Sequence, residues 1–126
     1  MFSTLSLVAL GGAIGASLRW LTGVAMLRAM GPSDFPMAII TVNVIGSFLM
    51  GVFVVAAAHK GLTHLSPFVM TGLLGGFTTF SAFSLETMTL IERGQVASAS
   101  LYILLSVGLS VGALALGLVL ARGVFA

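Results

Sequence analysis

The chain has 126 residues, of which 59% are hydrophobic and only 6% are charged, and its mean hydropathy is +1.22. Soluble domains usually contain about 25% charged residues, so this composition excludes an ordinary soluble domain and indicates one integral membrane domain, residues 1–126. Five Lys and Arg residues against three Asp and Glu form no basic run that would bind nucleic acid, and the absence of cysteine excludes disulfides and cysteine metal sites.

Four apolar stretches are long enough to cross a hydrocarbon core of about 30 Å. They lie at about 5–27, 37–58, 67–91 and 98–121, with short polar connectors between them. The sequence therefore predicts an all-α membrane protein with four transmembrane helices. We expect the first stretch to be a structural helix, because no charged lead-in or small-residue cleavage site of a signal peptide precedes or follows it.

The first predicted helix combines small residues with one charge. Gly11, Gly15 and Gly23 follow four-residue steps, with Arg19 in the same row. This spacing lets helix backbones approach closely in lipid. A mid-membrane arginine costs about 2.5–3.5 kcal/mol on insertion scales, so Arg19 is expected to face protein or water. Two roles stay open for Arg19: a structural clamp on carbonyls at a helix end, or a part of an anion path.

The second predicted helix carries a similar row, formed by Asn43, Ser47 and Gly51. Small residues at this spacing predict close helix packing. Asn43 adds a side-chain amide with both donors and an acceptor. Two roles remain open for the Asn43 side chain with equal weight: it can hydrogen-bond to another helix, or it can line a pore.

The third apolar stretch contains a helix-breaking segment, GLLGGFTTFSAFS, at residues 72–84. Gly75 and Gly76 each weaken a helix by about 1 kcal/mol relative to alanine. The hydroxyls of Thr78, Thr79 and Ser81 can cap a new helix start. The pattern predicts a third helix that is broken in the middle of the membrane. One half is expected at about 67–74, followed by an unwound turn and a second half from about residue 80.

This break predicts an ion-binding site. Irregular backbone survives at membrane depth only where it is buried in protein or lines a polar cavity. Unwound carbonyls can bind a cation, while the start of the second half favours an anion. Phe80 and Phe83 share one face of that half, and their electron-poor ring edges can contact an anion. The alternative is a glycine kink with two core phenylalanines. Glu86, farther along, fits a proton relay, a cation ligand or a partner for Arg19.

The fourth predicted helix carries three hydroxyls in register. Tyr102, Ser106 and Ser110 follow four-residue steps, so they lie on one stripe of the helix. A single serine in a membrane helix often bonds to its own preceding carbonyl. Three hydroxyls in register also predict a narrow polar track that donates hydrogen bonds to a passing anion.

The connectors give no orientation by the positive-inside rule. Lys60 and Arg122 lie on the side of both termini, and Arg28 and Arg93 lie on the opposite side. Because the Lys and Arg counts are equal, we expect the chain to insert both ways round and to form antiparallel dimers. The alternative is that a partner or translation kinetics fixes one orientation.

Three motifs resemble one known family. GGFTTFSAFSLE is similar to the GG-x-TTFSTF signature of the bacterial fluoride channels called the Fluc or CrcB family. GGAIGASLRW in the first helix and TVNVIGSFLMG in the second resemble that family's other two signatures. The resemblance covers essentially the whole chain. Ala82 departs from it, since a threonine is common there.

The resemblance implies an antiparallel, dual-topology homodimer with two fluoride pores at the subunit interface. Such a channel would export fluoride passively across the bacterial plasma (inner) membrane and so lower its toxicity in the cytoplasm. The implied partners are a second copy of the chain, fluoride and membrane lipid, but no nucleic acid. A structural sodium ion is implied at the dimer centre.

The resemblance also assigns residues. It implies a fluoride pathway of Phe80, Phe83, Asn43, Tyr102, Ser106 and Ser110, and sodium ligation by the main-chain carbonyls of Gly75 and Thr78. Arg19 matches the helix-one arginine of the family, for which we expect a structural role.

Other functions fit the residues less well. A small multidrug-type cation/proton exporter also has four helices, but it needs a carboxylate in the first helix, where this chain has Arg19. A noncatalytic assembly subunit would leave the interrupted third helix without a role. An enzyme is not expected, because the sequence has no nucleophile–base constellation or cluster of metal ligands.

Overall fold

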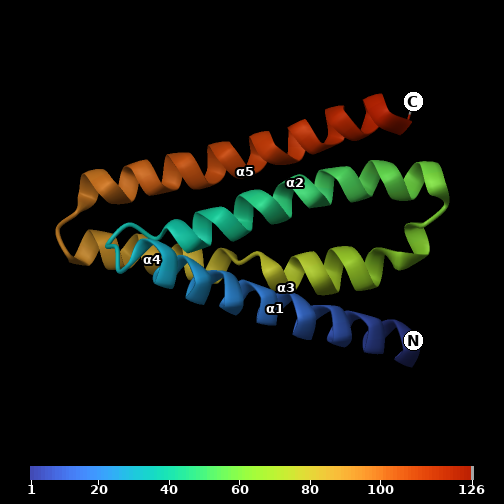
Figure 1. Ribbon diagram of the computed structural model, residues 1–126, viewed down its shortest axis with the longest axis horizontal. Coiled ribbons are helices and arrows are strands. Elements are labelled where there is room, and N and C mark those ends of the chain that lie inside the picture. The colour runs from blue at the N-terminus through green and yellow to red at the C-terminus, as the bar shows by residue number, and fades with distance from the viewer. Residues whose placement is uncertain (126) are drawn as a thin grey trace.

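The protein is built from helices joined by short connectors, as the computed structural model of residues 1–125 shows (Figure 1). No strand occurs within these residues. The elements in chain order are α1 (Phe2–Met30), α2 (Met37–Lys60), the short 3-10 turn η1 (Thr63–Leu65), the π-helical segment η2 (Pro67–Leu74), α3 (Gly75–Phe77), α4 (Phe80–Glu92) and α5 (Val96–Phe125).

The described residues include four helical stretches long and apolar enough to cross a membrane. They are Phe2–Met30, Met37–Lys60, Thr63–Glu92 and Val96–Phe125. The expectation of an all-α chain with four such stretches is confirmed. Both chain ends and the connector at 61–66 lie at one end of the molecule, and the connectors at 31–36 and 93–95 lie at the other (Figure 1).

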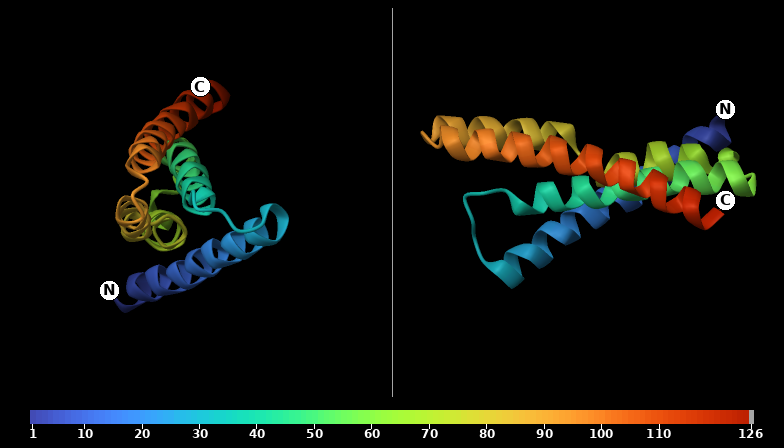
Figure 2. Two further views of the ribbon diagram at one scale, coloured as in Figure 1. Left: turned by 90° about the vertical axis from the view of Figure 1, so that its left-hand side faces the viewer. Right: turned by 90° about the horizontal axis from the view of Figure 1, so that it is seen from above.

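The helices form two packed pairs. One pair is α2 with α5, and the other is α1 with the first part of the third stretch, whose second part reaches across to α5. The helices α2 and α5 run parallel and lie side by side, whereas α1 crosses away from them (Figure 2). The first part of the third stretch, η2 and α3, packs on α1, and its second part, α4, packs on α5. The third stretch therefore changes its neighbour part-way along its length.

Close backbone contacts at glycine hold both pairs together. A Cβ atom on Gly76 would lie 2.7 Å from the carbonyl oxygen of Gly12 in α1. In the second pair, a Cβ atom on Gly117 of α5 would lie 3.1 Å from the amide nitrogen of Val52 in α2. Gly15 and Gly51 also face backbone, as expected from their rows, so only glycine permits these approaches. Gly23, Gly108 and Gly112 have no such neighbour within the described chain.

The end of α2 shows how glycine terminates these helices locally. Gly61 follows the last helical residue and has φ +67° and ψ 33°, the left-handed conformation that side chains other than glycine rarely adopt. The amide of Leu62 then donates to the carbonyl oxygen of Ala57 at 2.8 Å. This hydrogen bond satisfies one of the carbonyls that the helix end leaves without a partner.

The third stretch leaves helical geometry at two threonines, not at the paired glycines. Gly75 has φ −63° and ψ −36°, and the helix continues to Phe77. Thr78 (φ −87°, ψ 160°) and Thr79 (φ −154°, ψ 125°) are extended, and α4 begins at Phe80. The unwound turn expected between about residues 74 and 80 is thus shorter than predicted and lies at 78–79, whereas the second half begins at residue 80 as expected. The glycines are instead used for close packing, because Gly76 lies against α1.

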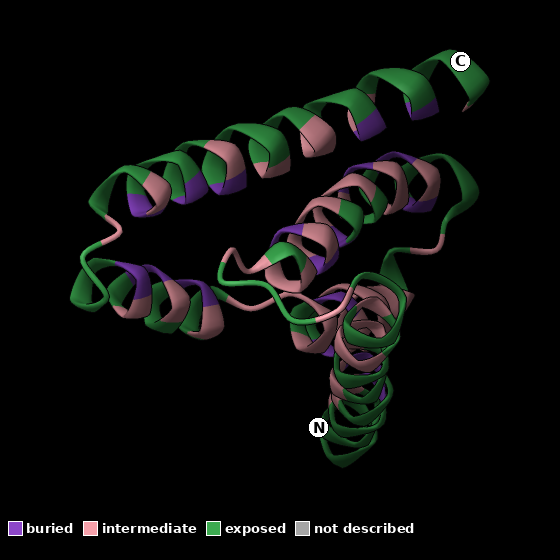
Figure 3. Cartoon of the chain, turned by 60° about the vertical axis from the view of Figure 1, so that its left-hand side comes forward, coloured by how far each residue is buried: buried purple, intermediate pink, exposed green. Residues whose placement is uncertain are grey.

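The outer surface carries many large apolar side chains, and Figure 3 shows where the exposed residues lie. Buried residues face the interior between the helices, while exposed residues cover the outside of α1 and α5. Large hydrophobic side chains on these faces are strongly exposed, for example Trp20 at 67%, Leu104 at 72% and Val111 at 66%. Such a surface is unsuited to water and fits contact with hydrocarbon or with another apolar chain.

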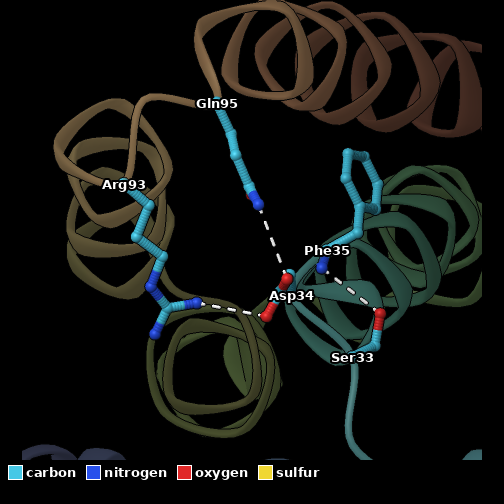
Figure 4. Close-up of polar contacts among 5 residues, drawn as sticks. All are labelled: Ser33, Asp34, Phe35, Arg93 and Gln95. Atoms are coloured by element: carbon cyan, nitrogen blue, oxygen red, sulfur yellow. Dashed lines mark hydrogen bonds and ion pairs between the residues drawn. The ribbon is translucent and has the colours of Figure 1, made fainter.

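Polar contacts join the two connectors at the end of the molecule away from the chain ends (Figure 4). Arg93 forms an ion pair with Asp34 at 3.4 Å, and Gln95 donates to the same carboxylate at 3.5 Å. The two charged side chains are 55% and 72% exposed. Ion pairs this exposed contribute at most about 1 kcal/mol, so the cluster orients the connectors and adds little stability.

Candidate functional site

A cavity of about 270 Å³ opens beside the two extended threonines. The elements α2, α4 and α5 and the residues between α3 and α4 form its walls. Its lining residues are Asn43, Ser47, Thr78, Thr79, Phe80, Phe83, Ser106, Val107, Ser110 and Val111. The structure thus brings together residues from all three predicted groups: the break, the aromatic pair and the hydroxyl stripe.

Asn43 is bonded to the extended backbone by two hydrogen bonds. Its Nδ2 donates to the carbonyl oxygen of Thr79 at 3.0 Å, and its Oδ1 accepts from the amide of Thr79 at 2.8 Å. The side chain therefore pairs with a peptide unit as a neighbouring strand would, and it satisfies both polar groups of Thr79. Asn43 also lines the cavity, so both roles that the sequence left open are compatible with its position.

Thr79 starts the second half of the stretch. Its Oγ1 accepts from the amide of Ala82 at 3.1 Å, which is the N-cap geometry expected at a helix start. The expectation that a hydroxyl in this segment caps a new helix is confirmed for Thr79. The Thr78 hydroxyl instead donates back to the carbonyl oxygen of Leu74 at 2.9 Å, and so belongs to the preceding helix.

Two carbonyls lose their helical donors at this point. In a continuous helix, the amides of residues 79 and 82 would donate to the carbonyls of residues 75 and 78. Here the amide of Thr79 donates to Asn43, and the amide of Ala82 donates to the hydroxyl of Thr79. The oxygens of Gly75 and Thr78 are thereby left without these partners. They are the two carbonyls to which the family resemblance assigns a sodium ion.

Arg19 contacts the end of the helix before the break. Its Nε donates to the carbonyl oxygen of Gly76 at 3.1 Å. This contact is the structural arrangement considered above, in which arginine binds a carbonyl at a helix end. Among residues 1–125 the ion pair that is found joins Arg93 and Asp34, and Glu86 forms none with Arg19.

The two phenylalanines lie next to each other but in different surroundings. Their ring centroids are 5.4 Å apart with planes tilted by 43°. Phe83 is buried at 9% exposure and also contacts Tyr102, with centroids 5.3 Å apart. Phe80 is 76% exposed at the rim of the cavity. The ring pair therefore extends from the buried interior to an outer surface of the single chain.

The hydroxyl stripe of α5 is buried and lacks hydrogen-bond partners. Within the part of the chain that the structure describes, the buried side-chain polar atoms without a partner are those of Tyr102, Ser106 and Ser110. Ser106 and Ser110 line the cavity, and Tyr102 lies one turn farther on, against Phe83. These serines do not bond to their own helix, which was the alternative for any one of them.

Sequence reasoning missed two polar lining residues, Ser47 and Thr79, and the apolar Val107 and Val111. Thr79 was considered only as a possible cap, although its backbone is the partner of Asn43. Ser47 was assigned to a packing row, although it lines the cavity. Its four-residue step from Asn43 was the available signal, since that step places both side chains on one face of α2.

No group of three or more His, Asp or Glu side chains suited to a metal ion occurs among the described residues. His59 lies in the last turn of α2 and stacks on Phe125 with ring centroids 6.2 Å apart.

Replacing Asn43 with leucine should destabilise the protein, because both polar groups of Thr79 would lose their partner. Each unpaired backbone group costs roughly 1–3 kcal/mol. Asn43→Asp keeps the acceptor for the Thr79 amide and should show a smaller loss. Thermal unfolding of the purified protein in detergent measures both changes.

Thr41→Val is the matched control on α2, because the Thr41 hydroxyl bonds only to its own helix, at the carbonyl of Met37. This variant should unfold near the wild-type temperature. A wild-type unfolding temperature for Asn43→Leu would contradict the role of Asn43 in stabilising the extended threonines.

Comparison with known proteins places the chain in a family. Residues 6–118 match the family model described as "CrcB-like protein, Camphor Resistance (CrcB)". Three relatives are each named "Fluoride-specific ion channel FluC". The protein of Ruegeria sp. (strain TM1040) is 68% identical, with 98% of each chain covered. That of Roseobacter denitrificans is 67% identical over 97% of this chain and 98% of its own. That of Cereibacter sphaeroides is 58% identical, with 98% of each chain covered.

The matches to the relatives span almost the full length of both partners, and the three sequence motifs and the cavity at the break lie within residues 6–118, which the family model matches. The relatives are ion channels, so the expectation that the chain is not an enzyme is confirmed. The chain belongs to the CrcB (Fluc) family and is a multi-pass membrane protein of that family.

Proposed function

We propose that this chain forms a fluoride-selective channel, through which fluoride leaves the cytoplasm passively across the bacterial inner (plasma) membrane. The observation that carries the proposal is the row of buried hydroxyls without partners, Tyr102, Ser106 and Ser110. A buried donor without an acceptor is unfavourable by about 1–3 kcal/mol. A small anion that moves along α5 supplies an acceptor to each hydroxyl in turn. Its export lowers fluoride toxicity in the cell.

The ring pair and the amide complete the pathway. Phe83 contacts Tyr102, so an anion that leaves the hydroxyls meets the aromatic pair directly. Ring edges carry partial positive charge and interact favourably with an anion. Asn43 has a second Nδ2 proton beyond the one it donates to Thr79, and this proton is available to the cavity. These weak, separate contacts suit conduction, which needs binding that an ion can leave as well as enter.

The working unit is an antiparallel, dual-topology homodimer whose third helices break in the middle of the membrane. Within one chain the cavity is open on one side and Phe80 is 76% exposed, so a second copy is needed to enclose the pathway. The apolar outer faces provide an interface for that copy and a surface for membrane lipid. The connectors carry two Lys or Arg residues at each end, so either orientation inserts.

Reporter proteins fused to the C-terminus test this arrangement. Because the charges are balanced, a cytoplasmic reporter and a periplasmic reporter should both be active in cells that express the respective fusion. Adding two lysines to one connector should shift the balance toward one face. Activity on a single face for the unmodified chain would contradict dual topology.

A structural sodium ion fits the break. The oxygens of Gly75 and Thr78 lack their usual helical donors, because Thr79 and Ala82 donate to side chains instead. Unpaired oxygens are unfavourable in a dry interior. Two antiparallel copies would offer four such oxygens at the dimer centre, and hard cations prefer oxygen ligands. The ion would fix the geometry of the break and add positive charge near the anion path.

Removing sodium should therefore lower fluoride flux. Protein purified and reconstituted in a large organic cation should lose most of its activity, and added sodium should restore it. Thr78→Ser keeps the main-chain oxygen and should respond to sodium as wild type does. Undiminished flux after exhaustive removal of sodium would contradict the proposed bound cation. It would not contradict the proposed fluoride pathway.

The function itself is tested with liposomes that contain only this protein. Fluoride efflux should be rapid and independent of any proton gradient, whereas chloride efflux should remain at the level of empty liposomes. The physical reason is that the buried donors surround a space suited to a small anion, which must exchange its hydration for those contacts.

Phe80→Ile and Phe83→Ile serve as variants in the same assay. Isoleucine keeps apolar volume but has no ring edge, so fluoride efflux should fall while the dimer still elutes as a dimer. Equal efflux of chloride would contradict selectivity. Efflux that requires a proton gradient would instead support the multidrug-type cation/proton exporter.

A further inference from the structure

Serine and threonine hydroxyls in this protein divide into two groups. One group donates to the carbonyl four residues earlier in its own helix, as hydroxyls in membrane helices commonly do. This group comprises Ser6, Ser17, Thr22, Thr41, Thr78, Ser84, Thr87, Thr89 and Ser100. A hydroxyl in this group has already used its proton and is not free to donate to an ion.

Among the described residues, Ser47, Ser106 and Ser110 do not make that hydrogen bond, and all three line the cavity. Thr71 and Ser98 do not make it either, but they lie outside the cavity lining. Ser106 and Ser110 are already part of the proposed pathway. Ser47 comes from α2, on another wall of the cavity, and the packing role that the sequence suggested for it does not use its hydroxyl.

The packing of α2 on α5 places Ser47 near Ser110. The two helices run parallel, and a Cβ atom on Gly51 would meet the carbonyl oxygen of Leu114 and lie 3.1 Å from the amide nitrogen of Leu118, so Gly51 lies between these two turns of α5. One turn earlier on both helices, Ser47 lies between the turn of Ser110, which also lines the cavity, and that of Leu114. Ser47 and Ser110 therefore lie on facing helices, at the end of the cavity nearer the chain termini.

We propose that Ser47 is a further fluoride-binding residue of this channel, whose hydroxyl donates to an anion held between α2 and α5 beside Ser110. The inference rests on the proposed function and adds a residue to it. At this level the neighbouring lining residue of α5 is the apolar Val111. With Ser47, the anion receives donors from two helices rather than from one. Two donors replace more of the hydration of a small anion than one donor does, which favours fluoride over larger anions.

The experiment compares fluoride efflux from liposomes over a range of fluoride concentrations. Ser47→Ala removes the hydroxyl, and the half-saturating fluoride concentration should rise by about tenfold, as expected for the loss of one hydrogen bond to a charged group. Ser47→Thr and Ser47→Val form a second pair, because they have nearly the same shape and differ in the hydroxyl. The threonine variant should remain close to wild type, and the valine variant should behave like alanine.

Ser17→Ala is the matched control. The Ser17 hydroxyl donates to the carbonyl of Ala13 at 2.7 Å in α1 and does not line the cavity. Its loss should leave the half-saturating concentration unchanged.

Equal fluoride dependence for Ser47→Ala and wild type would overturn the role of Ser47, as would equal behaviour of the threonine and valine variants. If the alanine variant does not assemble as a dimer, the threonine–valine comparison decides. Absence of fluoride efflux from the wild-type protein would instead overturn the proposed function, so the two failures are distinguishable.

Discussion

The pairing of the Asn43 side chain with the backbone of Thr79 is the interaction on which the site depends. In an apolar environment every backbone donor and acceptor needs a partner within the protein. Two hydrogen bonds of 3.0 and 2.8 Å satisfy both groups of the one residue that departs most from helical geometry. An asparagine is suited to this task because its amide has the same donor and acceptor arrangement as a peptide unit. The extended backbone of Thr79 obtains both of these hydrogen bonds from one side chain of α2.

The same interaction has consequences on both sides of the break. Before the break, the amide of Thr79 donates to Asn43 and not to the carbonyl of Gly75, and Arg19 donates to the next carbonyl, that of Gly76. After it, α4 starts in a new direction and packs on α5 rather than on α1. This change of neighbour brings Phe83 against Tyr102 and so connects the aromatic pair to the hydroxyl stripe.

Among the described residues, the buried side-chain hydroxyls without a partner are those of Tyr102, Ser106 and Ser110. A hydroxyl that bonds to its own helix presents little polarity to its surroundings, which suits a face exposed to lipid. The serines that line the cavity make no such bond, and two of them are fully enclosed and lack any partner. Buried donors of this kind are unfavourable until a ligand accepts hydrogen bonds from them. The protein thus keeps its unsatisfied donors at the one place where we propose that an anion passes.

The sequence by itself determined the local features of this protein. Four apolar stretches, the cap at Thr79 and the register of Tyr102, Ser106 and Ser110 each depend on residues within one or two helical turns. Only the tertiary structure decided where the third helix breaks. Paired glycines are the strongest local signal for a break, yet Gly76 remains helical because it packs against Gly12, more than 60 residues away in sequence. The threonines become extended because Asn43, 36 residues earlier, supplies their partner. The cavity role of Ser47 likewise depends on the packing of α2 against α5. Sequence spacing shows which residues share a face, but the partner that each face meets is fixed only when the helices pack.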